Sequence, residues 1–557
     1  MQCNRSRLLW TAAGILVAAL IQWGGAVKMA GAADEGNPDE DSKMKQARKE
    51  ATHRRRRIIY NDDGCGSIWK KDSGNTPERF LFGPHSRMGA VRGTQVDSVF
   101  ICSGATTVLN HTSSVAESYA DTEDRYGPFG GDFEHFRDNM RALEALGTDA
   151  IRLTVDFCRK HKIEVFYSYR VNDVHDTYDW CAVEHSTWKR EHPQYMMSTK
   201  EEGDKHAESD AKRMWSFLDF EIPEVREYLL SILDDVANRY DLDGMEIDYF
   251  RSPLFFRPNL ELKPATKAQL DVLTGFQGRV RQIALRAGAK RGRPMLVAAR
   301  VPMTVAMCKH VGIDIERWLA DDLLDVLPTG GGYVPFIMPT GELVKLGHRY
   351  QVPVYPTISG SSMRGGEGYD SIEAWRGTAA SAWRAGADGV YIFNHFPNKP
   401  DPQFMELGDP QKLATMDKLF VIDNGAGSYT WGGHAQAIPA ADVLPVEVPG
   451  DGSARTVRLP VGDDLPSAAT KGTLDGVMMT IQLSDPAILA GVEIKLNDRV
   501  LTPAATDAKK GRLSFQLDPS GCRVGDNRVS IRVTSPTKDG KSPAKLTAVE
   551  LRVKYRK

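Results

Sequence analysis

The segment Asp243-Gly244-Met245-Glu246-Ile247-Asp248-Tyr249 decides the fold of this 557-residue chain. A turn-forming Asp-Gly pair leads into a short strand in which apolar side chains alternate with two carboxylates. Residues two apart share one face of a strand, so Glu246 and Asp248 point the same way and the apolar residues point the opposite way. A second Asp-Gly pair, Asp388-Gly389, leads into the apolar segment 389–393. This repeated turn favours parallel strands.

From residue 58 to about residue 400, short apolar segments alternate with segments whose apolar residues recur at helical spacing. The predicted strands are 99–103, 163–168, 215–219, 244–249, 295–301, 324–327, 352–358 and 389–393. The predicted helices are 133–143, 149–160, 223–240, 266–289, 340–350 and 371–385. Right-handed crossovers between eight such strands favour a closed α/β TIM barrel, (β/α)8, and the alternative is an open doubly wound sheet.

After residue 430 the pattern changes to strict alternation of apolar and polar residues between Gly, Pro and Asp turns. The alternating segments are 457–459, 479–483, 492–496, 513–517, 529–533 and 549–553. This period of two is typical of half-buried antiparallel strands. We therefore expect a (β/α)8 barrel over residues 58–429 and an all-β sandwich or jelly roll over residues 430–557.

The first 57 residues are expected to lie outside both domains. Arg5 and Arg7 precede the apolar stretch 8–21, and small residues follow at 30–32, which is the order of a secretory signal peptide over residues 1–32. The alternative is a membrane anchor. We expect a secreted or periplasmic protein with no stable membrane anchor after cleavage. Residues 33–57 form a charged stretch that ends in four arginines, Arg54 to Arg57, and predict a solvated linker.

Composition narrows the function classes. Lys and Arg total 71 against 73 Asp and Glu, so no basic surface is expected and nucleic acid is not predicted as a partner. Six cysteines follow residue 32, none in a Cys-x-x-Cys pair. We expect them to be small buried residues, with at most one or two disulfides. No compact metal motif is present, and no metal or cofactor is predicted.

Reactive groups of a (β/α)8 barrel lie at its mouth, the end where the carboxyl ends of the strands meet. Asp248 belongs at the mouth, and two carboxylates that face the barrel interior are costly unless they are paired or used. Asp248 and Glu246 are therefore catalytic candidates, with a structural ion network as the alternative. Asp173 and His175 follow another strand and are further candidates. With Asp248 they can also ligate a divalent cation.

Substrate-binding candidates come from the predicted strand ends. Arg170 and Asn172 share a face, and an Arg can clamp a carboxylate or sulfate while an Asn hydrogen-bonds sugar hydroxyls. A capped, hydrogen-bonded loop is the alternative interpretation. The full set of binding candidates is Arg170, Asn172, Trp215, Asp219, Arg300, Tyr333, Asn394 and His395.

Four segments carry a resemblance to a known family: 155–165, 170–176, 223–228 and 243–251. They resemble the glycoside-hydrolase-like barrel proteins related to the alpha-amylase clan (glycosyl hydrolase-like 10 type), which are common among secreted bacterial proteins. The resemblance covers about residues 58–400. It implies hydrolysis of a poly- or oligosaccharide, with Asp248 in the position of the nucleophile on the fourth strand.

Two departures from related patterns concern the proton donor that glycosidic cleavage requires. Phe250 stands where a chitinase-type segment has its acid Glu, and the predicted fifth strand has no Glu in the position that the amylase clan uses. The sequence therefore names no general acid. The alternatives are a non-catalytic carbohydrate-binding protein that has lost the acid, and a metal-dependent hydrolase that uses the same mouth.

Overall fold

The computed structural model describes residues 38–122, 133–205, 215–330, 339–361, 368–423, 444–535 and 543–557. Two compact units are Met1–Lys43 and Met44–Lys557. The predicted signal peptide and the candidate Tyr333 lie outside the described residues. No helix of the described part of the chain is long and apolar enough to cross a membrane.

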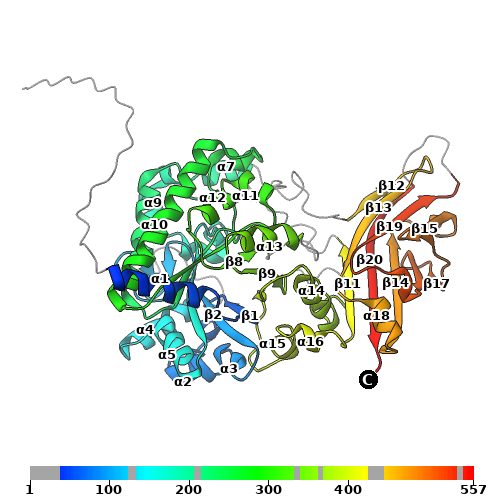
Figure 1. The fold of residues 1–557 in the computed structure, drawn as a ribbon. Coiled ribbons are helices and arrows are strands. Elements are labelled where there is room, and N and C mark those ends of the chain that lie inside the picture. The colour runs from blue at the N-terminus through cyan, green and yellow to red at the C-terminus, as the bar shows by residue number, and fades with distance from the viewer. Residues whose placement is uncertain are drawn as a thin grey trace, which may run out of the picture. The chain divides into compact units, whose positions relative to one another are not determined.

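Eight parallel strands form the barrel (Figure 1). They are β1 Ile58–Asp62, β2 Val96–Cys102, β5 Glu164–Arg170, β6 Gly244–Asp248, β7 Leu296–Arg300, β8 Leu327–Thr329, β9 Val354–Ser359 and β10 Val390–Phe393. Neighbours in the sheet follow the order of the chain, and β1 pairs with β10. Two bridges, Ala298 to Val326 and Val301 to Thr329, join β7 to β8 and close the ring. The predicted (β/α)8 fold is confirmed, and the open sheet is excluded.

One predicted strand is wrong. Residues 215–219 make only a single bridge, Met196 to Leu218, within the loop that follows β5. Phe217 and Leu218 are fully buried there, and a buried apolar loop has the same hydropathy pattern as a short strand. The missing strand is β1, which begins the ring at Ile58. The structure adds β1 and lacks the predicted strand at 215–219, so β6 is still the fourth strand of the barrel.

The six predicted helices are all present, and shorter ones cover the remaining crossovers. The α-helices of the barrel region are α1 Pro38–Thr52, α2 Pro77–Phe82, α3 Met88–Val91, α4 Phe133–Ala145, α5 Ala150–His161, α6 Thr187–Glu191, α7 Lys200–Lys205, α9 Pro223–Arg239, α10 Lys267–Arg291, α11 Val305–Val311, α12 Ile315–Ala320, α13 Thr340–Arg349, α14 Ile372–Arg384, α15 Pro402–Glu406 and α16 Pro410–Leu413. The 3-10 helices and short strands there are η1 Gly66–Ile68, η3 His175–Thr177, η4 Asp179–Glu184, η5 Pro193–Tyr195, η6 Arg257–Glu261, β3 Val108–Leu109 and β4 Glu117–Ser118. Side chains cap several starts: Asp149 accepts from the backbone of α5, and Thr266 and Gln269 form a capping box on α10.

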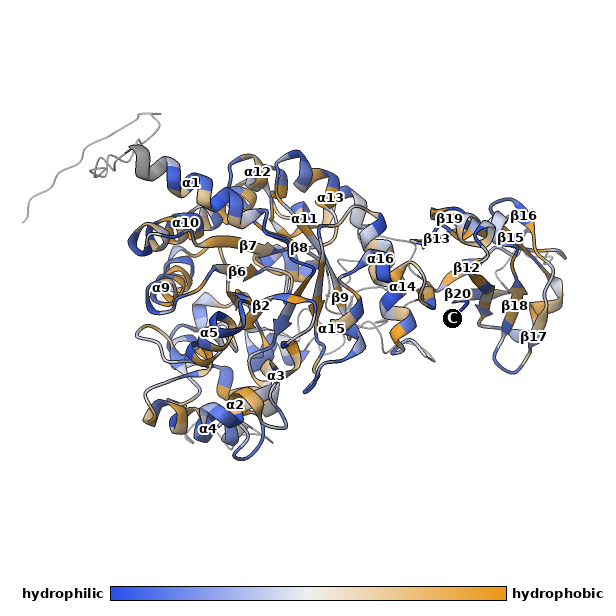
Figure 2. Ribbon diagram, turned by 60° about the horizontal axis from the view of Figure 1, so that its bottom comes forward, coloured by the Kyte–Doolittle hydropathy of each residue, from blue (hydrophilic) through white to orange (hydrophobic). Residues whose placement is uncertain are grey.

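The strands of the barrel divide their side chains between two cores. Met245 and Ile247 of β6 pack with the helices, as their spacing predicted. Phe100, Phe166 and Tyr391 belong to the aromatic-rich interior cluster of the barrel. Figure 2 shows hydrophobic residues in orange along β6 and β7 and many hydrophilic residues in blue on the surrounding helices. Both faces of the barrel strands are therefore buried, as in other parallel sheets.

The expected solvated linker is corrected at its carboxyl end. Arg56 is fully buried, and its guanidinium donates to both carboxylate oxygens of Glu164, at 2.6 and 2.8 Å. Ser98 donates to the same carboxylate at 2.6 Å. Arg57 forms an ion pair of the same kind with Asp97. The basic run therefore contributes counter-ions to the barrel, because an Arg pairs well with buried carboxylates.

The β domain consists of two antiparallel sheets. One contains β11 Lys418–Asp423, β12 Val446–Val448, β14 Leu474–Leu483, β17 Ala505–Asp507, β18 Arg512–Gln516 and β20 Ala544–Tyr555. The other contains β13 Arg455–Val461, β15 Val492–Leu496, β16 Arg499–Val500 and β19 Gly525–Val533, and α18 Leu465–Thr470, η9 Pro486–Gly491 and η10 Pro519–Gly521 connect strands. Five of the six alternating segments predicted from the sequence lie within these strands, and the segment 513–517 extends one residue beyond β18. Their inward residues form one apolar core.

The six cysteines among the described residues are free thiols, and five of them are buried. The five buried cysteines are thus small core residues in this structure.

Candidate active site

Asp248 ends β6 as one half of a buried ion pair. Arg300, which lies opposite it in the register with β7, donates from Nε to Oδ1 at 2.9 Å and from Nη2 to Oδ2 at 2.7 Å. The backbone N–H groups of Phe250 and Arg251 also donate to Oδ1, at 3.0 and 2.9 Å. Asp248 is 2% exposed and Arg300 0%. The carboxylate is therefore fixed in position by four hydrogen bonds.

Arg300 is itself held from three sides. Its Nη1 donates to the backbone oxygen of Gly330 at 3.2 Å, and its guanidinium lies 4.2 Å from the centroid of the Phe393 ring. A guanidinium over an aromatic face is favoured by the ring quadrupole. The fifth strand therefore places a cation beside Asp248.

Glu246 lies two residues before Asp248 on β6, deeper in the barrel, and its carboxyl group has different partners. Ser168 and Tyr391 both donate to its Oε2, at 2.5 and 2.9 Å, while Oε1 has no partner among the described residues. Burial, and next the charge of Asp248, raise the pKa of Glu246 to about 8. At neutral pH this carboxyl is protonated, and its full burial keeps it away from a substrate in the mouth.

The loop after β5 brings Asp173 and His175 into contact with two arginines. His175 donates from its backbone N–H and from Nδ1 to Asp173 Oδ1, at 3.0 and 2.5 Å. Arg170 Nη1 is 3.5 Å from Asp173 Oδ2, and Arg251 Nη2 donates to His175 Nε2 at 2.9 Å. Burial opposes ionisation of Asp173, but His175, Arg251 and Arg170 hold its pKa well below the usual range. Because Arg251 follows Asp248 by three residues, this cluster adjoins the ion pair.

Three other binding candidates support the mouth loops. The amide of Asn172 donates to the backbone oxygens of Leu218 and Leu254 and accepts from Leu218 N–H, which joins two loops. Asp219 pairs with Arg257 at 2.9 Å. Trp215 packs against the His185 ring, with centroids 5.2 Å apart. These side chains are engaged with their own loops rather than with the Asp248 cluster.

The two candidates at the end of β10, Asn394 and His395, have different surroundings. Asn394 has a positive φ of 50° and donates to Ser361 Oγ at 2.7 Å. His395 contacts Asp401 through Nε2 at 2.6 Å and packs against the rings of Trp375 and Phe404. Its side chain thus lies in the helix layer.

Sequence reasoning missed Glu184, at the end of η4 in the loop after β5. Glu184 is buried and accepts a hydrogen bond from the hydroxyl of Tyr119 at 2.5 Å. Burial is the largest cause that raises its pKa to about 7, His175 opposes the rise, and Asp173 adds to it. The available signal was a lone acidic residue at the end of the apolar run 181–183. A carboxyl with this pKa is able to donate a proton near neutral pH.

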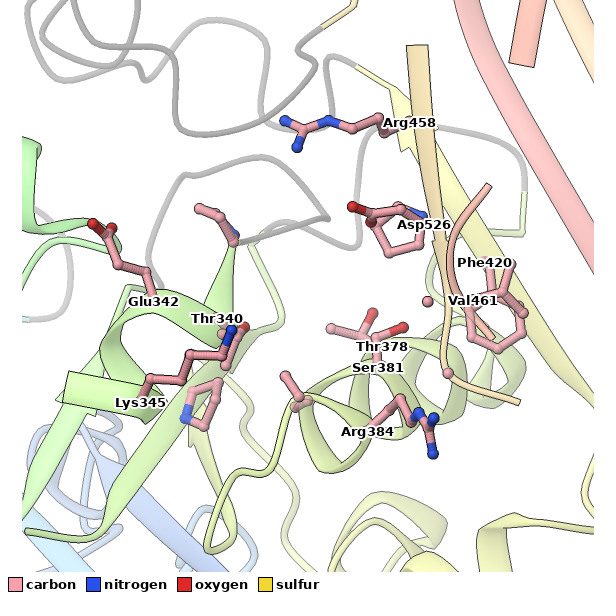
Figure 3. Close-up of a pocket in the computed structure, with 18 of the residues that line it drawn as sticks. Thr340, Glu342, Lys345, Thr378, Ser381, Arg384, Phe420, Arg458, Val461 and Asp526 are labelled. Carbon is pink, nitrogen blue, oxygen red and sulfur yellow. The ribbon is translucent and has the colours of Figure 1, made fainter. Parts of the chain in front are cut away.

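The large cavity drawn in Figure 3 lies elsewhere. Its volume is about 960 Å³, and it is lined by residues of α13, α14, β11, β13 and β19, including Lys345, Arg384, Phe420 and Asp526. None of the residues predicted for the site lines it. In the described ranges, no three His, Cys, Asp or Glu residues gather closely enough to hold a metal ion.

One family model matches part of the barrel region. Residues 133–259 match the family described as Glycosyl hydrolase-like 10. This range contains β5, β6, Asp173, Glu184 and Asp248. The match confirms the resemblance stated from the sequence: this part of the barrel is glycosyl-hydrolase-like. No curated protein matches the chain.

Several solved structures are similar to the chain at low identity. The glycoside hydrolase domain of PgaB (BpsB) from Bordetella bronchiseptica is 14% identical with a TM-score of 0.35, covering 61% of this chain and 93% of that one. An alpha-amylase from Geobacillus thermoleovorans is 12% identical with a TM-score of 0.33, covering 85% and 98%. An endo-beta-1,4-mannanase from Thermotoga petrophila is 10% identical with a TM-score of 0.35, covering 90% and 98%.

Proposed function

We propose that the barrel hydrolyses glycosidic bonds of a poly- or oligosaccharide at its mouth, with Asp248 as the nucleophile or base. One observation carries this proposal: the mouth region holds two carboxyl groups in different environments. Asp248 is ion-paired with Arg300, whereas burial raises the pKa of Glu184 to about 7. Glycosidic cleavage needs a nucleophile or base and a proton donor, and a raised pKa suits Glu184 to the second role.

Asp248 is suited to the ionised role because its two oxygens differ. Oδ1 accepts three hydrogen bonds, whereas Oδ2 accepts only from Arg300 among the described residues. A carboxylate oxygen has two lone pairs, so Oδ2 keeps one for a sugar carbon or a water molecule. Arg300 would orient the carboxylate through the reaction.

Glu184 is suited to the protonated role. Glu246 is also protonated at neutral pH, but it is fully buried inside the barrel. Glu184 lies in a mouth loop, and only its Oε1 has a partner among the described residues, the Tyr119 hydroxyl. Its other oxygen is therefore available to donate a proton to the leaving group.

The test is turnover of a glycan panel by the full chain and by Asp248→Asn. We expect a loss of about a thousandfold or more in kcat, because the amide neither attacks nor accepts a proton. Asp97→Asn is the matched control: it also removes an Arg-paired carboxylate from the barrel, at the amino end of β2. Turnover that Asp248→Asn leaves unchanged would refute the assignment.

Carbohydrate binding without turnover is the second candidate function. It is favoured by the 2% exposure of Asp248 and by its four hydrogen bonds, which also suit a structural ion pair. Saturable binding of a glycan with no product after prolonged incubation would favour this reading. A metal-dependent hydrolase is separated from both by turnover that a chelator abolishes.

We also propose that the protein is exported, since residues 1–32 have the order of a signal peptide. The measurement is the amino-terminal sequence of the mature chain. A mature chain that begins after about residue 32 supports export, and one that retains Arg5 and Arg7 contradicts it.

A further inference from the structure

Arg170 and Arg251 have more hydrogen-bond donors than the protein around them uses. Each guanidinium has five N–H groups. Among the described residues, the guanidinium of Arg170 has one partner, Asp173 Oδ2 at 3.5 Å, although Arg170 is only 9% exposed. Arg251 donates to His175 Nε2, and its Nε lies 3.9 Å from the same Asp173 oxygen. Most of the donors on these two side chains are therefore left for another acceptor.

The carboxylates nearest to the two guanidiniums also have other partners. Asp173 is the carboxylate that the two guanidiniums share, and its Oδ1 is already occupied by His175. Asp63 is close to Arg170 but forms its own ion pair with Arg87 at 3.2 Å. His175 already accepts from one guanidinium N–H of Arg251 at Nε2 and donates from Nδ1 to Asp173.

A buried cation without its own counter-ion is costly, which favours an anionic group from a ligand at this place. Glu184 is only partly ionised near neutral pH, because burial raises its pKa to about 7. The thiols of Cys65 and Cys102 lie beside Arg170, and burial raises the pKa of both, so they are neutral.

We propose that the mouth takes an anionic saccharide, whose carboxylate or sulfate group is bound by Arg170 and Arg251. This inference rests on the proposed function, since it names the substrate class of the same site. The planar fork of a guanidinium matches two oxygens of a carboxylate or sulfate. The backbone N–H of Arg251 donates to Asp248 Oδ1, so the anionic sugar unit would lie next to the reacting carboxylate.

The test is calorimetric binding to the full-length chain of three probes: trigalacturonate, a sulfated carrageenan tetrasaccharide and neutral cellotetraose. We expect one anionic probe to bind at least about tenfold more tightly than cellotetraose, since hydrogen bonds to charged groups are the strong ones. Arg170→Gln and Arg251→Gln should each lower the ratio of anionic-probe affinity to cellotetraose affinity by about tenfold, and Lys at either position should restore part of it. Arg349→Gln, on the exposed end of α13, is the matched control.

The outcomes separate this inference from the proposed function. Equal or tighter binding of cellotetraose, no binding of either anionic probe, or an anion preference that survives both Gln variants would each overturn it. Turnover of neutral glycans that depends on Asp248, without anion preference, would leave the hydrolase proposal standing alone. Preferential binding of an anionic probe without turnover of any glycan would support the anion site and contradict the hydrolase proposal. If Arg170→Gln fails to fold, Arg251→Gln decides, because Arg251 lies in the loop after β6 and not in a strand of the barrel.

Discussion

Glu246 shows how a single proton contributes to the stability of the barrel. Its pKa rises from an ordinary value of 4.5 to about 8, through burial first and Asp248 second. A carboxyl whose pKa is raised by folding stabilises the folded state below its unfolded pKa. That contribution is lost as the pH rises through the folded pKa.

We therefore predict that Glu246→Gln changes the pH dependence of stability. Relative to the variant, the natural protein should lose about 1.4 kcal/mol of unfolding free energy per pH unit between about pH 5 and pH 8. Urea unfolding at both pH values measures this, with the exposed Glu447→Gln as the control. Parallel slopes for Glu246→Gln and the natural protein would contradict the raised pKa.

Glu184 leads to a prediction about activity. If it is the proton donor, kcat falls as the pH rises above about 7, because the acid form is depleted there. Glu184→Gln should lower kcat by about a hundredfold or more and remove this limb of the pH profile. Glu191→Gln on the neighbouring α6 is an exposed control. A basic limb that persists in Glu184→Gln would assign the titration to another group.

At the level of these residues, the sequence predicted where the side chains of Asp248 and Glu246 point, but not the environment of Glu184. The period of two on the fourth strand placed Asp248 and Glu246 inside the barrel, and both side chains face it. Glu184 has no such periodicity, since its environment comes from Tyr119 and from the loop that contains Asp173. A pKa set by contacts distant in sequence is not encoded in local spacing.

At the level of elements, contacts between residues distant in sequence explain the two wrong predictions, the strand at 215–219 and the solvated basic run before β1. The strands at 244–249 and 389–393 were predictable because an Asp-Gly turn precedes each of them. Their remaining residues are apolar or, like Glu246 and Asp248, face the barrel interior. Residues 215–219 have that hydropathy as well, but their backbone partners lie within the loop, at Met196. The basic run before β1 was misassigned for a related reason: its counter-ion, Glu164, is on another strand.

This ion pair gives an element-scale prediction. Arg56→Met should destabilise the protein by about 3–5 kcal/mol, since it leaves the carboxylate of Glu164 buried without its cation. The double variant Arg56→Met/Glu164→Met should recover most of the loss. Urea unfolding measures both, with Arg54→Ala in the exposed part of the same run as the control. A double variant as unstable as the single one would mean that packing rather than charge holds this segment.

At the level of the whole molecule, β11 joins the barrel to the β domain. Leu419 and Val421 pack in the core that contains the barrel helices, whereas Phe420 and Ile422 pack in the core of the β domain. Alternate residues of one strand thus belong to both cores. Tyr369 adds a hydrogen bond to Glu550 of β20 at 3.0 Å. The β domain therefore packs against the barrel through β11 and β20.

Gly377 of α14 packs directly against the backbone of β11, and this contact yields a prediction. A Cβ there would collide with the backbone carbonyl of Leu419, which cannot move aside as a side chain would. Gly377→Ala should therefore cost about 1–3 kcal/mol and lower the melting temperature of the full chain in calorimetry. Gly275→Ala is the matched control in α10, where a Cβ meets nothing within 4 Å, and it should stabilise by up to about 1 kcal/mol. Because both changes carry the same gain in helix propensity, equal shifts would show that α14 and β11 do not pack this closely in solution.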